Sequence, residues 1–172
     1  MRGTRRGHGR NRALGVRATV FSLALATALG TLAGCATPLP VDPAPHAADP
    51  DCARVMLAMP DALGGLDRRG TTAQATDAWG AEYPIVAKCG ADVPAPTTDP
   101  CVTVDTAGYS VDWIVYEGAD AWVATTYGRK PALEVTVPKI RADAAINDLL
   151  AALTPPASLA PATGRSCVGL GD

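Results

Sequence analysis

The sequence predicts an α+β fold: a small, mainly antiparallel sheet of four to five strands with helices packed on one face and two disulfides. Three observations predict it. Between residues 101 and 137, apolar and β-branched segments recur at intervals too short for helical crossovers. Residues 140–153 place apolar side chains along one stripe of a helix. Four cysteines follow residue 50, enough for two disulfides.

Two helices are predicted before the strands. Asp49 is a good helix cap and Pro50 suits a first helical position, so a helix should start there and stop before Pro60. Thr71 and Gln74 match a capping box, which predicts a second, short helix over residues 73–79.

The strands are predicted from apolar runs separated by turn residues. Their expected ranges are 84–90, 101–104, 109–117, 121–127 and 132–137. The last helix should cover this sheet and end at Pro155-Pro156, because proline lacks the backbone donor that a helix needs.

Charge divides the chain into two unlike parts. Residues 1–35 hold six arginines and no acid, so all 17 acidic residues lie further on, against nine Lys and Arg. The remainder therefore carries about eight net negative charges, which argues against a nucleic-acid partner. Ala18 to Ala33 is apolar and uncharged, and arginines followed by such a run outline a secretory signal peptide. An uncleaved membrane anchor is the alternative.

Leu32-Ala33-Gly34-Cys35 resembles a bacterial lipobox. The resemblance implies removal of residues 1–34, a diacylglyceryl group on the Cys35 sulfur, and acyl chains that hold the protein on the outer face of the cytoplasmic membrane. The alternative is an ordinary free or buried cysteine. Residues 36–50 contain five prolines and should form a tether, which leaves residues 51–172 as a single extracytoplasmic domain.

The other four cysteines permit three pairings. Cys89 and Cys101 flank one proline-rich loop, so we expect a Cys89–Cys101 disulfide and, with it, Cys52–Cys167. Zinc is disfavoured because the chain has no Cys-x-x-Cys pair and no histidine near these cysteines. No cofactor is predicted.

Motifs for catalysis are scarce. His46 is the only histidine after Cys35 and falls in the expected tether, so it cannot serve a Ser-His-Asp or Cys-His arrangement. Trp113 and Trp122 are expected to be cross-strand neighbours that, with Asp112, could form a ligand surface; a core role for the tryptophans is the plainer alternative. Acid–base chemistry would have to use carboxylates near the strands: Asp105, Asp112, Glu117 or Asp120.

Several blocks resemble an actinobacterial family of secreted lipoproteins catalogued as a domain of unknown function. They are Trp79-Gly80, Pro84 to Val86, Cys89-Gly90 and Val111 to Trp113, within a resemblance covering Cys52 to Cys167. Family members often carry arginine before the Cys-Gly pair, where this chain has Lys88. The resemblance implies the location and disulfides, but no reaction.

The sequence is therefore interpreted as a lipid-anchored, non-enzymatic binding or accessory module of the cell envelope. Its expected partners are the membrane, through acyl chains on Cys35, and an envelope protein or glycan. A carboxylate-dependent enzyme of envelope metabolism and a structural subunit docking on a membrane complex are the alternatives.

Overall fold

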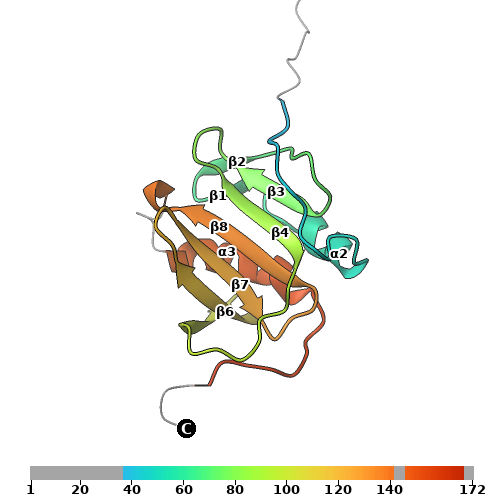
Figure 1. The fold of residues 1–172 in the computed structure, drawn as a ribbon, viewed down its shortest axis with the longest axis vertical. Coiled ribbons are helices and arrows are strands. Elements are labelled where there is room, and N and C mark those ends of the chain that lie inside the picture. Colours follow the sequence, from blue (N-terminus) through green and yellow to red (C-terminus); the bar gives the residue numbers. More distant parts are fainter. Residues whose placement is uncertain (1–36, 142–145, 169–172) are drawn as a thin grey trace, which may run out of the picture. The chain divides into compact units, whose positions relative to one another are not determined.

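The computed structural model describes residues 37–141 and 146–168, in which an eight-stranded sheet has the order β1-β2-β3-β4-β8-β7-β6-β5 (Figure 1). Every pair of named strands is antiparallel. The elements are α2 (Asp51–Leu57), β1 (Ala62–Leu63), β2 (Leu66–Arg69), β3 (Thr76–Trp79), β4 (Ile85–Ala91), β5 (Cys101–Thr106), β6 (Tyr109–Glu117), β7 (Ala121–Tyr127), β8 (Ala132–Pro138), the 3-10 helix η1 (Lys139–Arg141) and α3 (Ile146–Ser158).

The antiparallel character and the presence of two disulfides are confirmed, but the predicted strand number is wrong. The error lies in the first third of the sheet, where β1, β2 and β3 were not expected. Residues predicted as a second helix instead contain β3, whose four residues are all buried. The Thr71 hydroxyl donates to the carbonyl of Thr76, at 2.9 Å, and so closes a turn instead of capping a helix. Pairing with β4 overrides the local helix pattern.

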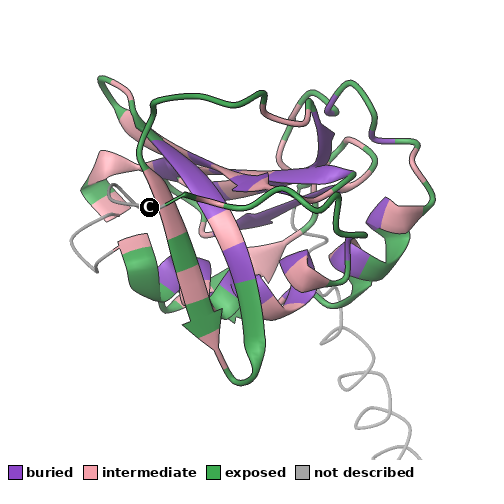
Figure 2. Cartoon of the chain, turned by 90° about the horizontal axis from the view of Figure 1, so that it is seen from below, coloured by how far each residue is buried: buried purple, intermediate pink, exposed green. Residues whose placement is uncertain are grey.

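The helices do not pack together on one face, which also corrects the prediction. Helix α3 contacts β5 and β6, whereas α2 contacts β4 and α3. Figure 2 shows the buried residues gathered on the strands and on the inner side of the helices. Pro155 and Pro156 lie inside α3 rather than ending it. Because Pro156 and Ala157 are buried, packing keeps this last turn helical although two backbone donors are missing.

Residues 39–50 are part of the folded unit and do not form the predicted free tether. Leu39 N–H donates to Gly70 O at 2.8 Å, and His46 N–H donates to Gly90 O at the same distance. Gly90 has φ +93°, and a Cβ on it would lie 2.3 Å from the carbonyl carbon of His46, so only glycine admits this crossing. The folded unit therefore begins near Leu39 instead of at residue 51.

The disulfides join Cys52 to Cys89 and Cys101 to Cys167, so the predicted pairing is wrong. Adjacency in sequence across the loop was misleading, because β8, β7 and β6 separate β4 from β5 in the sheet. Cys89 is fully buried with Cys52 in the core. Cys101 begins the edge strand β5, where the C-terminal segment arrives.

Candidate functional site

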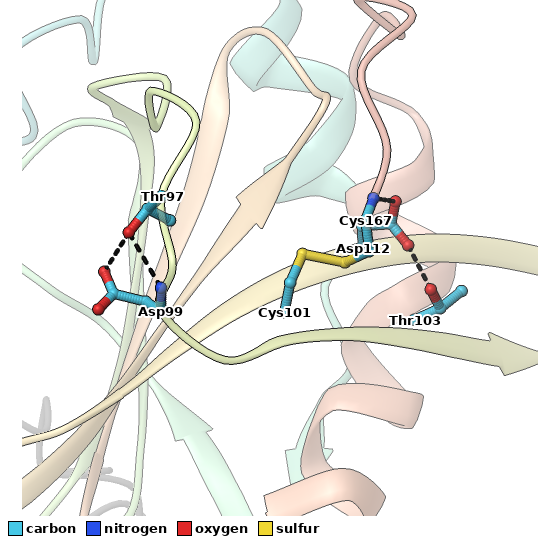
Figure 3. The surroundings of a disulfide bond; sticks show 6 residues. All are labelled: Thr97, Asp99, Cys101, Thr103, Asp112 and Cys167. Atoms are coloured by element: carbon cyan, nitrogen blue, oxygen red, sulfur yellow. Dashed lines mark hydrogen bonds between the residues drawn. A yellow bond between two sulfur atoms is a disulfide. The ribbon is translucent and has the colours of Figure 1, made fainter. Parts of the chain in front are cut away.

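The Cys101–Cys167 disulfide holds the C-terminal segment against the outer face of the sheet, the face turned away from α3 (Figure 3). Asp112 on β6 supports this junction with both oxygens. Its carboxylate accepts a hydrogen bond from the Cys167 N–H at 2.7 Å and another from the Thr103 hydroxyl at 2.7 Å. The position of Cys167 is therefore set by a covalent bond and a charge-assisted hydrogen bond together.

A cavity of about 870 Å³ opens beside this disulfide. Its walls are the loop at 96–100, Cys101, Ile114 and Tyr127 on the sheet, and residues 166–168. We call it the disulfide pocket. Its volume lies within the range of about 300–1,000 Å³ typical of small-molecule sites.

The lining of the disulfide pocket is mostly apolar, with few polar groups. Two prolines, Ile114 and Val168 supply apolar surface, and Asp99 supplies a carboxylate. The Thr97 hydroxyl donates to that carboxylate at 2.8 Å and accepts the Asp99 N–H at 3.1 Å (Figure 3). Asp99 is thus the one carboxylate in the lining of a largely apolar hollow, a composition suited to an apolar ligand with a polar group.

Of the three predicted ligand-surface residues, only Asp112 reaches this region. Trp113 is fully buried, and its indole N–H has no hydrogen-bond partner among the described residues. Trp122 is half-buried, with the Lys139 ammonium 5.9 Å from its ring centre. The two tryptophans are not cross-strand neighbours, because Trp113 pairs with Thr126 and Trp122 pairs with Glu117.

Apart from Cys101 and Cys167, the residues that line the pocket carried no signal in the sequence. Ile114 and Tyr127 look like ordinary outward positions of alternating strands. They become pocket walls only because the C-terminal segment crosses them. Correct pairing of Cys101 with Cys167 was the one inference that could have indicated this.

A second cavity, of about 720 Å³, is charged instead of apolar. It lies between His46, Asp49, Lys130 and Arg165. His46 Nε2 lies 3.2 Å from the carboxylate of Asp92, on the surface. Charges of both signs thus meet there, and the arrangement selects no single ligand class.

Two carboxylates, Glu117 and Asp77, pair with cations in different parts of the sheet. Glu117 lies 2.9 Å from the Lys139 ammonium. Burial raises the pKa of Asp77 above its ordinary value, and the hydrogen bonds and positive charge of Arg68 oppose this rise. Arg68 binds both Asp77 oxygens, at 2.8 and 2.6 Å, and also donates to carbonyls at the end of α2, so this pair belongs to the packing of the core.

Residues 37–141 and 146–168 contain neither a metal-binding cluster nor a membrane-spanning helix. That part of the chain holds no group of three or more His, Cys, Asp or Glu side chains placed to bind a metal. None of its helices has the length and apolar character needed to cross a membrane. Cys35 lies outside the described residues.

Comparison with known proteins identifies a family. No curated protein and no solved structure shows significant similarity to the chain. Residues 13–160 match the family described as "Protein of unknown function (DUF3515)". The match spans most of the sequence and includes both Cys52 and Cys101, and the chain belongs to this family.

Proposed function

We propose that this protein is a lipid-anchored, extracytoplasmic module of the bacterial cell envelope that binds a small, largely apolar ligand in the disulfide pocket without catalysing a reaction. The observation that carries the binding role is the pocket itself, an apolar hollow with one oriented carboxylate at Asp99. An actinobacterial source is part of the proposal and is supported by the sequence resemblance.

Two observations support the location. The lipobox at Cys35 follows an uncharged apolar stretch and a basic start, the order of a lipoprotein signal. The other four cysteines form two disulfides, as expected of a protein outside the reducing cytoplasm. Lipidation gives the fifth cysteine a separate role.

The anchor is tested by Cys35→Ala, with Ala36→Ser as the matched control. Cells expressing each variant are fed an alkyne-labelled fatty acid, and the protein is followed by gel mobility and by membrane fractionation. We expect the control to be labelled and shortened, whereas Cys35→Ala remains an unlabelled precursor. Normal processing of Cys35→Ala would contradict the lipid anchor.

The binding role is tested by filling the pocket. Thr98 lines it and is exposed, so Thr98→Trp should block ligand entry without disturbing the core. Leu57→Trp, at a position 85% exposed outside the pocket lining, is the control. The lipoproteins are purified from membranes, and small molecules released on denaturation are compared by mass spectrometry. A molecule retained by wild type and control but lost from Thr98→Trp supports the proposal; identical extracts from all three argue against it.

The two alternatives have less support. A carboxylate-dependent enzyme needs a free acid–base pair in a cleft, but Asp112 and Glu117 are both bonded to neighbouring groups, and neither Asp105 nor Asp120 lines either of the two large cavities. A docking subunit needs a large exposed apolar patch, whereas the exposed large apolar side chains of the described residues are scattered over several elements.

A further inference from the structure

The start of the folded unit is bound tightly to one end of the sheet. Leu39 pairs with Thr71 in an isolated bridge, with hydrogen bonds of 2.8 and 3.0 Å on its two sides. The Arg69 guanidinium donates to the carbonyl of Thr37 at 2.9 Å. The same guanidinium donates to the carbonyl of Ala81 at 3.4 Å, in the turn between β3 and β4. Thr37 is thus held beside that turn.

Chain connectivity then limits how far a lipid anchor can lie from this end. Only Ala36 separates Thr37 from Cys35 in the sequence. Two extended residues span at most about 7 Å. Acyl chains on Cys35 would therefore enter the bilayer close to the β3–β4 turn. A long tether would have left the orientation of the domain open, but this link is too short to do so.

The surface at this end suits a lipid headgroup region. Tyr83 in the β3–β4 turn is 59% exposed, and Ile140 in η1 is 61% exposed. Arg141 joins the two segments by donating to the carbonyls of Glu82, at 2.5 Å, and Tyr83, at 3.3 Å. Tyrosine and arginine both suit the membrane interface, where an apolar body and a polar end are satisfied together.

We infer that the β3–β4 turn and η1 rest on the outer surface of the membrane, with Tyr83 and Ile140 entering the interfacial layer. The inference rests on the proposed lipid anchor at Cys35. Arg69 and Arg141 are offset by Asp67 and Glu82 nearby, so the short covalent link and the apolar side chains, more than net charge, hold the contact. The C-terminal segment that walls the disulfide pocket leaves the sheet at the opposite end from Thr37 (Figure 1), so this segment lies away from the proposed membrane contact.

The test compares the native lipoprotein with a variant carrying a Gly-Ser spacer of about 20 residues between Ala36 and Thr37, which has a root-mean-square span of about 25 Å. Both are reconstituted into vesicles of phosphatidylglycerol and phosphatidylethanolamine, and flotation verifies their anchoring. Hydroxyl-radical oxidation of tyrosines is then quantified by mass spectrometry. Tyr109, 45% exposed in the β5–β6 hairpin, is the internal reference.

We expect Tyr83 to be oxidised at least about threefold more slowly in the native lipoprotein than in the spacer variant, because interfacial burial excludes water from the ring. Tyr109 should react equally in both. Equal rates at Tyr83 in two proteins that both float with vesicles would overturn the orientation and leave the anchor standing. Failure of both proteins to float would refute the anchor, and the orientation with it.

Discussion

The two ends of the folded unit are secured by the same three devices, but the disulfide of one set is buried in the core and that of the other is partly exposed at the surface. At the N-terminal end, these devices are the Cys52–Cys89 disulfide, Arg68 on β2, which donates to the last turn of α2, and Gly90. At the C-terminal end, the corresponding features are Cys101–Cys167, Arg129 and Gly128.

Each arginine donates to two carbonyls, one in the last turn of a helix and one just after the helix ends. Arg68 donates to the carbonyls of Met56 and Met59, and Arg129 to those of Ser158 and Ala160. Only Arg68 also holds a buried carboxylate, that of Asp77. The comparison indicates that the N-terminal set stabilises the core, while the C-terminal set positions a surface segment that forms the pocket.

Removal of the buried disulfide should have the largest effect on stability. Loop-closure entropy alone predicts about 4 kcal/mol for Cys52–Cys89, whose cysteines are 37 residues apart. Cys52→Ala/Cys89→Ala also leaves a cavity in the core, which adds to this loss. Urea unfolding monitored by tryptophan fluorescence measures the change.

Removal of the partly exposed Cys101–Cys167 disulfide should reduce stability less, although its loop is longer. The separation of 66 residues raises the entropic estimate by only about 0.5 kcal/mol, less than the core packing lost at Cys52 and Cys89. In Cys101→Ala/Cys167→Ala we expect a folded sheet with a released C-terminal segment, cut by trypsin after Arg165. A greater loss of stability than in the buried pair would contradict the comparison.

The order of reduction provides a test without mutation. Cys101 and Cys167 are half-exposed, whereas Cys52 and Cys89 are at most 2% exposed. Under native conditions with dithiothreitol, alkylation followed by peptide mass mapping should label Cys101 and Cys167 at least about tenfold faster, because a thiolate must reach the sulfur it attacks. Equal labelling of all four would show that the two sites do not differ in access.

Alanine at Gly90 should cost about 2 kcal/mol or more. It combines a left-handed backbone with a backbone clash at His46, and strain of this kind typically costs about 1–3 kcal/mol. Gly65→Ala is the matched control, because Gly65 has φ +75° with no atom within 4 Å of an added Cβ.

Gly128→Ala, whose Cβ would lie 2.1 Å from the carbonyl oxygen of Arg165, should instead loosen the C-terminal segment. Thermal unfolding and hydrogen exchange report the two effects separately.

The smallest effect concerns pH. Burial raises the pKa of Asp77 above its unfolded value, so the folded state binds this proton more tightly than the unfolded state. The contribution of Asp77 is therefore fully present below its ordinary pKa near 3.8 and declines as pH rises through the raised pKa of the folded state. Through this one group, the free energy of unfolding can change by at most about 1.4 kcal/mol per pH unit. Urea unfolding of wild type and Asp77→Asn across this pH range should show wild type losing stability relative to the variant as pH rises. If wild type instead gains stability relative to Asp77→Asn as pH rises, the direction of the pKa shift is wrong.

Strands with one buried face were the most predictable part of the fold. The predicted ranges 109–117 and 121–127 match β6 and β7, because short turn sequences bound each run. The strand β3 and the end of α3 were not predictable, because burial against distant residues decides both. For the same reason Trp113, a possible ligand-surface residue in the sequence, has the core role that was its plainer alternative.

The sequence by itself determined the antiparallel meander from β5 to β8, since local alternation and turn chemistry are enough for strands that pair with their neighbours. It also contains the lipobox on which the proposed cellular location depends. Only the tertiary structure decided which cysteines pair, that residues 39–50 pack on the sheet, and that the C-terminal segment makes a pocket. Each of these depends on contacts between residues far apart in the chain, and no local pattern encodes them.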